Sequence, residues 1–203
     1  MKRVVLASAN AGKLRELAAL LAPCGLELIS QATLGIEPVP ETGSTFLDNA
    51  LLKARHAARE AQLPALADDS GLEVDALDGR PGVWSARYAG EGASDAANLA
   101  RLLAELADIP AARRGARYQC VLACVRTPAD PAPVIARGTW EGHIARAPRG
   151  TGGFGYDPAF VPQGETRTAA ELPPAEKNAV SHRGLAARAL VAALQEAGVY
   201  SRP

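Results

Sequence analysis

Ala67-Asp68-Asp69-Ser70-Gly71 is the stretch that decides the fold, and an apolar run over residues 63–67 leads directly into it. Such a run predicts a buried strand that ends at a polar edge of an α/β sheet, where these sheets usually bind ligands. Adjacent carboxylates repel each other unless a cation or positive side chains offset them, so a metal or proton-transfer site is one hypothesis. Residues 68–71 are also of the types that are common in turns, and considered alone they favour a turn.

Length and charge set broad limits. The 203 residues are enough for one domain or two small lobes with a substantial core. Lys+Arg and Asp+Glu both number 22, so the net charge is zero. This balance argues against a general nucleic-acid binder but does not exclude a site for one nucleotide. No apolar run approaches the roughly 18 residues of a membrane span. Residues 1–8 begin like a signal peptide, but polar residues follow too soon for secretion.

Three cysteines indicate a reducing compartment. Cys120 and Cys124 lie four apart in a strand-like run, which separates their Cα atoms by about 13 Å, too far for a disulfide. Neither they nor Cys24 has the spacing of metal ligands, so we expect a cytoplasmic protein.

The N-terminal segment predicts a strand over 2–7, a polar turn, and a helix that Pro23 and Gly25 close. A helix N-terminus with an early lysine, Lys13, can cradle a phosphate. The alternative is an Asn10 N-cap with a solvated lysine, and the turn alone does not decide between them.

A second helix is expected from Ser44 or Thr45 to residue 61. Asn49 and Lys53 interrupt a face that Phe46 and Ala57 would otherwise make apolar. A buried lysine needs an anionic partner, which is either a structural carboxylate or a bound phosphate. Glu41, just upstream of the helix, favours the phosphate.

The middle of the chain predicts mainly scaffold. A strand over 72–77, a turn at 78–79 and a long loop over 80–90 precede a helix that begins at Ser94 and is assigned no chemistry. Strands over 116–126 and 133–144 form a hairpin.

Two later blocks carry chemical groups. In the glycine-rich block 150–160, Phe154 and Tyr156 offer stacking faces for a base and Asp157 offers acceptors, although a tight loop with aromatic anchors is the alternative. Residues 177–183 place Lys177, Ser181, His182 and Arg183 within two helical turns, ahead of a final helix over 183–197 that Gly198 ends. Such a cluster is usually a solvated face.

Six ordered motifs together resemble the inosine triphosphate pyrophosphatase family, and most closely its bacterial dITP/XTP branch. They cover residues 8–13, 41–54, 67–77, 81–90, 152–158 and 176–183, and the resemblance extends over essentially the whole chain. It implies an α/β protein, elongated and two-lobed around a long mixed β-sheet flanked by helices, with the active site in the cleft between the lobes. It implies one domain, 1–203, whose two lobes are not separable by a linker.

The family resemblance also implies a function. It implies Mg²⁺-dependent hydrolysis of deaminated purine nucleoside triphosphates (dITP, ITP and XTP) to the monophosphate and pyrophosphate, which cleanses the nucleotide pool. It further implies a cytoplasmic homodimer with a small-molecule nucleotide substrate and no nucleic-acid or membrane partner.

By the same resemblance, Glu41 and Asp69 are expected to bind Mg²⁺, and Asp69 to act as the catalytic base. Asp68 and Asn49 are expected to support them without touching the metal. The expected substrate-binding residues are Ser8, Ala9, Asn10, Ala11, Gly12, Lys13, Lys53, Ser70, Phe154, Gly155, Tyr156, Asp157, Lys177, His182 and Arg183.

A donor from Arg183 or His182 facing position 6 of the purine would favour the oxygen of hypoxanthine and xanthine over the amino group of adenine. Two alternatives stay open. One is a Maf-type pyrophosphatase acting on modified pyrimidine nucleotides, against which the blocks 154–158 and 181–183 speak. The other is a nucleotide-binding sensor without turnover, which would gain little from carboxylates beside a triphosphate.

Overall fold

A computed structural model describes residues 3–197, which leaves the start of the first predicted strand and the predicted helix stop at Gly198 outside the described residues. Six strands form one sheet in the order β2-β1-β3-β4-β5-β6. Their bounds are Arg3–Ala7 for β1, Glu27–Ser30 for β2, Ala65–Val74 for β3, Gly115–Val125 for β4, Val134–Ile144 for β5 and Phe160–Pro162 for β6. β1 runs parallel to β2 and β3, whereas β5 and β6 are antiparallel, so the predicted α/β class with a mixed sheet is confirmed.

The chain divides into two compact units. Unit 1 comprises residues 1–69, 120–138 and 183–203, and unit 2 comprises residues 70–119 and 139–182. β3, β4 and β5 contribute residues to both.

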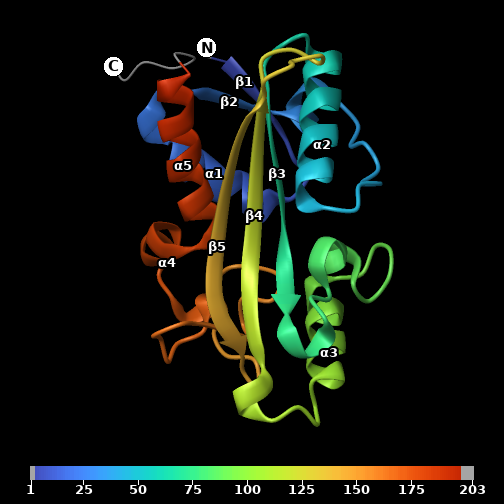
Figure 1. The fold of residues 1–203 in the computed structure, drawn as a ribbon, viewed down its shortest axis with the longest axis vertical. Coiled ribbons are helices and arrows are strands. Elements are labelled where there is room, and N and C mark those ends of the chain that lie inside the picture. The colour runs from blue at the N-terminus through green and yellow to red at the C-terminus, as the bar shows by residue number, and fades with distance from the viewer. Residues whose placement is uncertain (1–2, 198–203) are drawn as a thin grey trace. The chain divides into compact units, whose positions relative to one another are not determined.

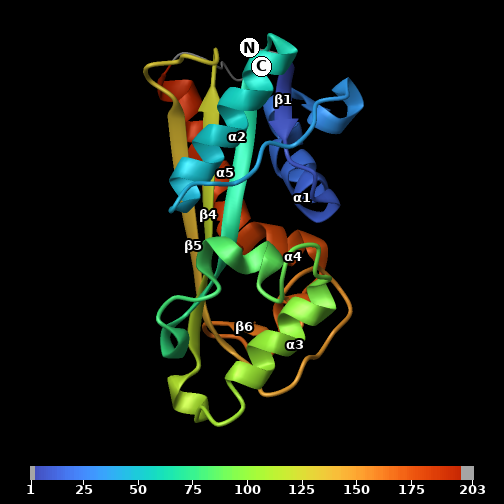
Figure 2. The ribbon, with the colours of Figure 1, turned by 90° about the vertical axis from the view of Figure 1, so that its right-hand side faces the viewer.

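In unit 1, helices cover both faces of the strands (Figure 1). α1 (Ala11–Leu21) and α5 (His182–Glu196) pack on one face, against alternate residues of β1 and β4 such as Leu6 and Leu122. α2 (Phe46–Ala61) packs on the other face, against the intervening residues such as Val5 and Val121. Figure 2 shows α2 crossing in front of the strands. This alternation is the period-2 pattern of strands buried on both sides.

Alanines let α2 lie close to the sheet. The residues Ala50, Ala54, Ala57 and Ala58 are fully buried, and they meet alanines of β3 in the same cluster. Small side chains allow close approach of a helix and a strand, so this part of the core is packed without bulky residues.

The stretch at residues 67–71 does not end a strand and does not form a turn. β3 continues through it to Val74, and Asp68 and Asp69 are both buried within the strand. Both readings of the sequence were therefore wrong here, as was the separate strand over 72–77. The strand can continue because basic side chains offset the two carboxylates, which removes the need for a solvent-exposed turn.

Local signals fix several helix ends correctly. Asn10 caps α1 and Thr45 caps α2, each accepting a hydrogen bond from the backbone N–H three residues on. Ser94 caps α3 (Asp95–Glu105) in the same way. Gly25 adopts φ +64° after the 3-10 turn that follows α1, as the predicted stop requires.

In unit 2, α3 packs on a core that contains Leu72, Tyr118, Trp140 and Phe160. The block 150–158 is a run of turns, and α4 (Pro174–Val180) follows. Ser181 has an extended backbone between α4 and α5, so the predicted cluster 177–183 belongs to two helices and not to one.

Cys24, Cys120 and Cys124 are buried thiols that form no disulfide among residues 3–197. Between residues 3 and 197, no helix combines the length and the apolar character that a membrane crossing needs.

Candidate active site

The N-terminal turn of unit 1 is fixed by its own side chains. Ser8 Oγ accepts a hydrogen bond from the Asn10 N–H at 3.2 Å, and Asn10 Oδ1 accepts one from the Lys13 N–H at 3.0 Å. The predicted Asn10 cap is therefore confirmed. Lys13 is not solvated, because its ammonium lies 2.7 Å from Oδ1 of Asp68 and only 15% of its side chain is exposed.

Asp68 is a buried carboxylate between two cations. Besides Lys13, the Arg183 Nε donates to its Oδ2 at 2.8 Å, and the Cys120 thiol lies 3.3 Å from the same oxygen. Burial alone would raise the pKa of Asp68, but Arg183 and Lys13 outweigh it and hold that pKa well below its usual range. Arg183 also donates to Glu16 of α1. Asp68 therefore ties α1, β3 and α5 together.

Lys53 joins the two predicted metal ligands. Its ammonium donates to Glu41 Oε1 at 2.6 Å, to Asp69 Oδ1 at 2.7 Å and to the Asp68 carbonyl at 2.8 Å. The sequence left a structural carboxylate and a bound phosphate open as partners of this lysine and favoured the phosphate. The structure shows the two carboxylates, and phosphate binding by Lys53 stays a prediction. The structure thus brings Glu41, Lys53 and Asp69 together, as the motifs predict.

Asp69 keeps one oxygen available. Its Oδ2 is buried and has no hydrogen-bond partner among residues 3–197. Burial raises the pKa of Asp69 more than the nearby Lys53 and Lys13 lower it. A buried acceptor of this kind is typical of a site that takes a proton or a cation.

Asn49 shapes the segment that carries Glu41. Its Oδ1 accepts a hydrogen bond from the Gly43 N–H at 2.7 Å, which holds the chain two residues after Glu41. A Cβ at Gly43 would lie 2.6 Å from Cβ of Asp48, so this close approach requires glycine. The supporting place predicted for Asn49 agrees with this contact.

In unit 2, the glycine-rich loop closes on Asp157. The Phe154 N–H donates to Asp157 Oδ2 at 2.9 Å, and the Lys177 ammonium donates to the same oxygen at 2.6 Å. That ammonium also lies 5.1 Å from the centre of the Phe154 ring, within cation–π range. Phe154, Asp157 and Lys177, predicted from separate motifs, therefore share one contact network.

Tyr156 anchors the loop instead of offering a face. Its ring is buried in the core of unit 2 and its hydroxyl donates to the Ser85 carbonyl at 2.8 Å. This corrects the prediction of a stacking face at Tyr156, because a ring packed in the core cannot also cover a base.

His182 is held by aromatic stacking in unit 2. Its ring lies 4.5 Å from that of Tyr118 at an interplanar angle of 7°. Its neighbour Arg183 belongs to unit 1. Ser70 follows Asp69 in β3 and is half-buried.

Four contributing residues were missed from the sequence. Asp95 at the start of α3 accepts a hydrogen bond from the Gly155 N–H at 2.8 Å, although that helix was assigned no chemistry. The other three are Glu16, which contacts Arg183, Cys120, which contacts Asp68, and Tyr118, which stacks on His182. Only Glu16 had a signal, because it lies three residues after Lys13 on α1 and so shares a helix face with it.

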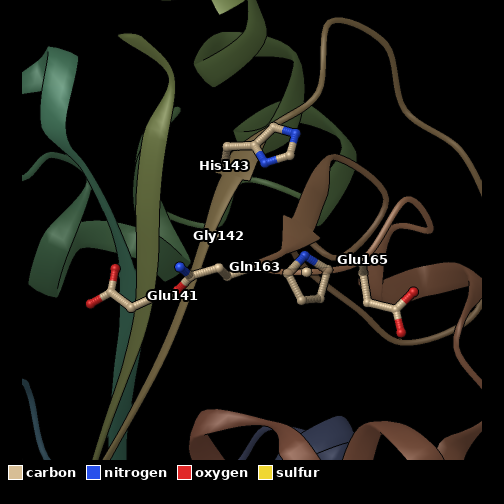
Figure 3. Close-up of a pocket in the computed structure, with 7 residues that line it drawn as sticks. Glu141, Gly142, His143, Gln163 and Glu165 are labelled. Carbon is tan, nitrogen blue, oxygen red and sulfur yellow. The ribbon is translucent and has the colours of Figure 1, made fainter. Parts of the chain in front are cut away.

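A hollow of about 500 Å³ lies elsewhere in unit 2. Its lining residues are Glu141, Gly142, His143, Pro162, Gln163, Gly164 and Glu165, none of them a predicted site residue. Figure 3 shows the carboxylates of Glu141 and Glu165 pointing away from each other. They pair with Arg117 and Arg167 respectively, so this hollow gathers no converging charged groups.

Within the described part of the chain, no three His, Cys, Asp or Glu side chains gather as a metal site. Glu41 and Asp69 are the pair best placed to share a cation, because they already share the Lys53 ammonium.

Comparison with known proteins places the chain in a family. The model of the Ham1 family matches residues 4–193. The dITP/XTP pyrophosphatase of Methylococcus capsulatus is 57% identical over 194 residues, 96% of each chain. That of Escherichia coli K12 is 54% identical over 195 residues, 96% of this chain and 99% of the relative.

Solved structures agree. A HAM1 protein from Coxiella burnetii has a TM-score of 0.88 at 50% identity and covers 97% of this chain and 100% of its own. A dITP/XTP pyrophosphatase from Mycobacterium abscessus has a TM-score of 0.74 at 53% identity and covers 95% of this chain and 98% of its own. The chain belongs to the Ham1 family.

Proposed function

We propose that this protein hydrolyses the deaminated purine nucleoside triphosphates dITP, ITP and XTP to the monophosphate and pyrophosphate. The observation that carries the proposal is its identity of more than half, over nearly the full length of both chains, with relatives named dITP/XTP pyrophosphatase. The proposed role is to remove these nucleotides from the pool before they enter DNA or RNA.

The reaction needs charge stabilisation more than covalent chemistry. Water attacks the α-phosphorus in line while pyrophosphate leaves, so the site must position the triphosphate and offset its negative charge. The charged cluster of unit 1 is suited to this, because Lys13 and Lys53 alternate there with buried carboxylates.

Glu41 and Asp69 are proposed to hold Mg²⁺. Their oxygens are the hard donors that this ion prefers, and the buried Oδ2 of Asp69 lacks a hydrogen-bond partner among the described residues. Mg²⁺ commonly takes one or two protein carboxylates and completes its shell with water and substrate phosphates, so two carboxylates suffice. When bound, the ion would neutralise phosphate charge and lower the pKa of a bound water.

Asp69 is proposed as the base that accepts the proton of the attacking water. Its raised pKa and its buried Oδ2 suit proton acceptance better than the well-lowered pKa of Asp68 does. We assign Asp68 the supporting role of orienting Lys13.

The phosphate chain is proposed to bind at the start of α1, where backbone N–H groups and the helix dipole favour anions. The residues involved are Ser8, Ala9, Asn10, Ala11, Gly12 and Lys13, joined by Lys53 and Ser70.

The base is proposed to bind against the loop of unit 2. Phe154 supplies the stacking face, and His182 supplies a donor for the oxygen at position 6. Gly155 and Tyr156 are proposed to contact the base through their backbone atoms. Arg183 is proposed as a second candidate donor for the oxygen at position 6, because a guanidinium carries N–H groups and no acceptor.

Exclusion of GTP requires a different contact, at position 2. The charge of Asp157 is offset by Lys177 at 2.6 Å, so this carboxylate attracts the amino group of guanine less than a lone carboxylate would. We propose that this pairing limits the affinity for GTP.

A panel of nucleoside triphosphates with Mg²⁺ tests the proposal, with pyrophosphate and orthophosphate assayed separately. Release of pyrophosphate from ITP, dITP and XTP, well above that from ATP, GTP and modified pyrimidine nucleotides, is the expected result. Preference for modified pyrimidines would indicate the Maf-type activity, and tight ITP binding without product would indicate a sensor.

The cellular setting follows from the same proposal. A nucleotide-pool substrate and three buried cysteine thiols that are not in disulfides fit the cytoplasm. We also propose a homodimer, which sedimentation equilibrium tests through a mass of twice 21.0 kDa.

A further inference from the structure

All three donors of the Lys53 ammonium are used inside the protein. They meet Glu41 Oε1, Asp69 Oδ1 and the Asp68 carbonyl, at 2.6, 2.7 and 2.8 Å. A lysine ammonium has three N–H groups, so no donor is left over for a phosphate in this arrangement.

The ammonium is also the cation that holds two carboxylates together. Only 14% of the Lys53 side chain is exposed. Its ammonium lies 2.6 Å from Glu41 Oε1 and 2.7 Å from Asp69 Oδ1, so it pairs with both carboxylates at once. Without a cation between them, Glu41 and Asp69 would repel each other.

This position conflicts with a free metal ion. A divalent cation on Glu41 and Asp69 would lie close to a full positive charge in a partly buried site, where screening is weak. It would also compete for the same carboxylate oxygens. An incoming phosphate changes this balance, because it offers the ammonium another anionic partner.

We propose that Lys53 is a built-in counter-cation that keeps free divalent metal out of the site until phosphate groups draw the ammonium away from Glu41 and Asp69. The inference rests on the proposed function, since it takes these two carboxylates as metal ligands. Its consequence is that metal and the phosphate chain bind cooperatively, each raising the affinity for the other by the same factor. The ligand that fits the site is then a metal–polyphosphate complex and not the bare ion.

The test is a calorimetric titration of Mn²⁺ into nucleotide-free protein, with and without saturating pyrophosphate as the phosphate probe. For the wild type, pyrophosphate should raise the affinity of the protein for Mn²⁺ at least tenfold, after correction for the Mn²⁺ that pyrophosphate binds in solution. Lys53→Met, which keeps an unbranched side chain of similar size but removes the ammonium, should bind free Mn²⁺ at least tenfold more tightly than the wild type.

Two further variants separate this role from a general charge effect. Lys13→Met removes an equal charge whose direct partner is Asp68, so it should tighten free Mn²⁺ binding clearly less than Lys53→Met does. Lys53→Arg keeps the charge and should bind free Mn²⁺ as weakly as the wild type. Thermal unfolding of each variant checks that it is folded.

The inference is overturned if Lys53→Met binds free Mn²⁺ no more tightly than the wild type, or if Lys13→Met tightens binding as much. If Lys53→Met does not fold, the test is the effect of pyrophosphate on Mn²⁺ binding by the wild type. An absence of any such effect overturns the inference. A separate assay of pyrophosphate release from ITP keeps the two questions apart. Cooperative Mn²⁺ binding without ITP hydrolysis would contradict the function and not the role of Lys53.

Discussion

Nε of Arg183 lies 2.8 Å from Oδ2 of Asp68, and both residues are 1% exposed. Lys13 takes the other carboxylate oxygen at 2.7 Å. Asp68 is therefore a buried, charged tie between three elements of unit 1, and its lone pairs are committed to cations of the protein. The neighbouring Asp69 has the available oxygen, so two adjacent aspartates have different environments and different proposed roles.

Replacing Asp68 should destabilise the fold strongly. Asp68→Ala removes the buried carboxylate that Lys13 and Arg183 share, and breaking a buried ion pair costs about 3–5 kcal/mol of unfolding free energy. Urea unfolding followed by circular dichroism measures the loss. Glu91→Ala is the control, because Glu91 is 87% exposed and its pair with Arg87 should contribute less than about 1 kcal/mol. Similar losses in the two variants would contradict this account of Asp68.

Replacing Asp69 should abolish turnover and spare the fold. Loss of a general base typically reduces kcat by about 10²–10⁴-fold, and Asp69→Asn keeps the size of the side chain. Steady-state release of pyrophosphate from ITP measures the effect. Asp75→Asn changes an aspartate that is 55% exposed in unit 2 and should leave kcat unchanged. Near-normal ITP hydrolysis by Asp69→Asn would remove Asp69 from both of its proposed roles.

Asp95 should act on substrate affinity. Asp95→Ala frees the Gly155 N–H, so the loop carrying Phe154 loses one hydrogen bond worth about 1 kcal/mol, which corresponds to roughly a fivefold rise in KM for ITP. The value of kcat should change little, because Asp95 touches no reacting group. Asp95→Asn keeps an acceptor oxygen and should restore most of the affinity. A fall in kcat at constant KM would contradict this positioning role.

Asp130 should contribute to acid sensitivity. Hydrogen bonds from the Arg126 side chain and from two backbone N–H groups outweigh burial and lower the pKa of Asp130 below its usual value. A lowered folded-state pKa stabilises the protein above the unfolded value of about 3.9, and that stabilisation is lost as pH falls toward the folded pKa.

The unfolding free energy of Asp130→Asn should therefore fall less steeply than that of the wild type between about pH 5 and pH 3. Urea unfolding at several pH values measures the slope. Asp108→Asn, at an exposed position, should keep the wild-type slope. A wild-type slope in Asp130→Asn would show that the Arg126 pair makes no contribution.

Helix ends were predictable because their signals are local. Asn10, Thr45 and Ser94 each satisfy an N–H group of their own first turn, so a few residues of sequence suffice to place them. The signal for the strand over 116–126 was also local, and the predicted strand matches β4 within one residue at each end.

β3 was not predictable because its continuation depends on distant partners. Read locally, Asp68 and Asp69 end an apolar run. The groups that let the strand pass through them are Arg183 and Lys53, which lie 115 and 16 residues away. The residue types of a charged site could be recognised in the sequence, but their pairing could not. A phosphate was favoured over a carboxylate as the partner of Lys53, whose ammonium contacts Glu41 and Asp69 in the structure.

Asp95 and Tyr118 show the same limit. An aspartate in the first turn of a helix is common for dipole reasons alone. An aromatic residue in a strand normally indicates a position in the hydrophobic core. Their contacts with Gly155 and His182 depend on how chain segments far apart in sequence pack in unit 2.

Hydrolysis of ITP in ¹⁸O-labelled water, with mass spectrometry of both products, tests the central claim most directly. If water attacks the α-phosphorus, the inosine monophosphate carries one ¹⁸O per turnover and the pyrophosphate carries none. Label in the pyrophosphate, or release of orthophosphate in its place, would contradict the proposed reaction.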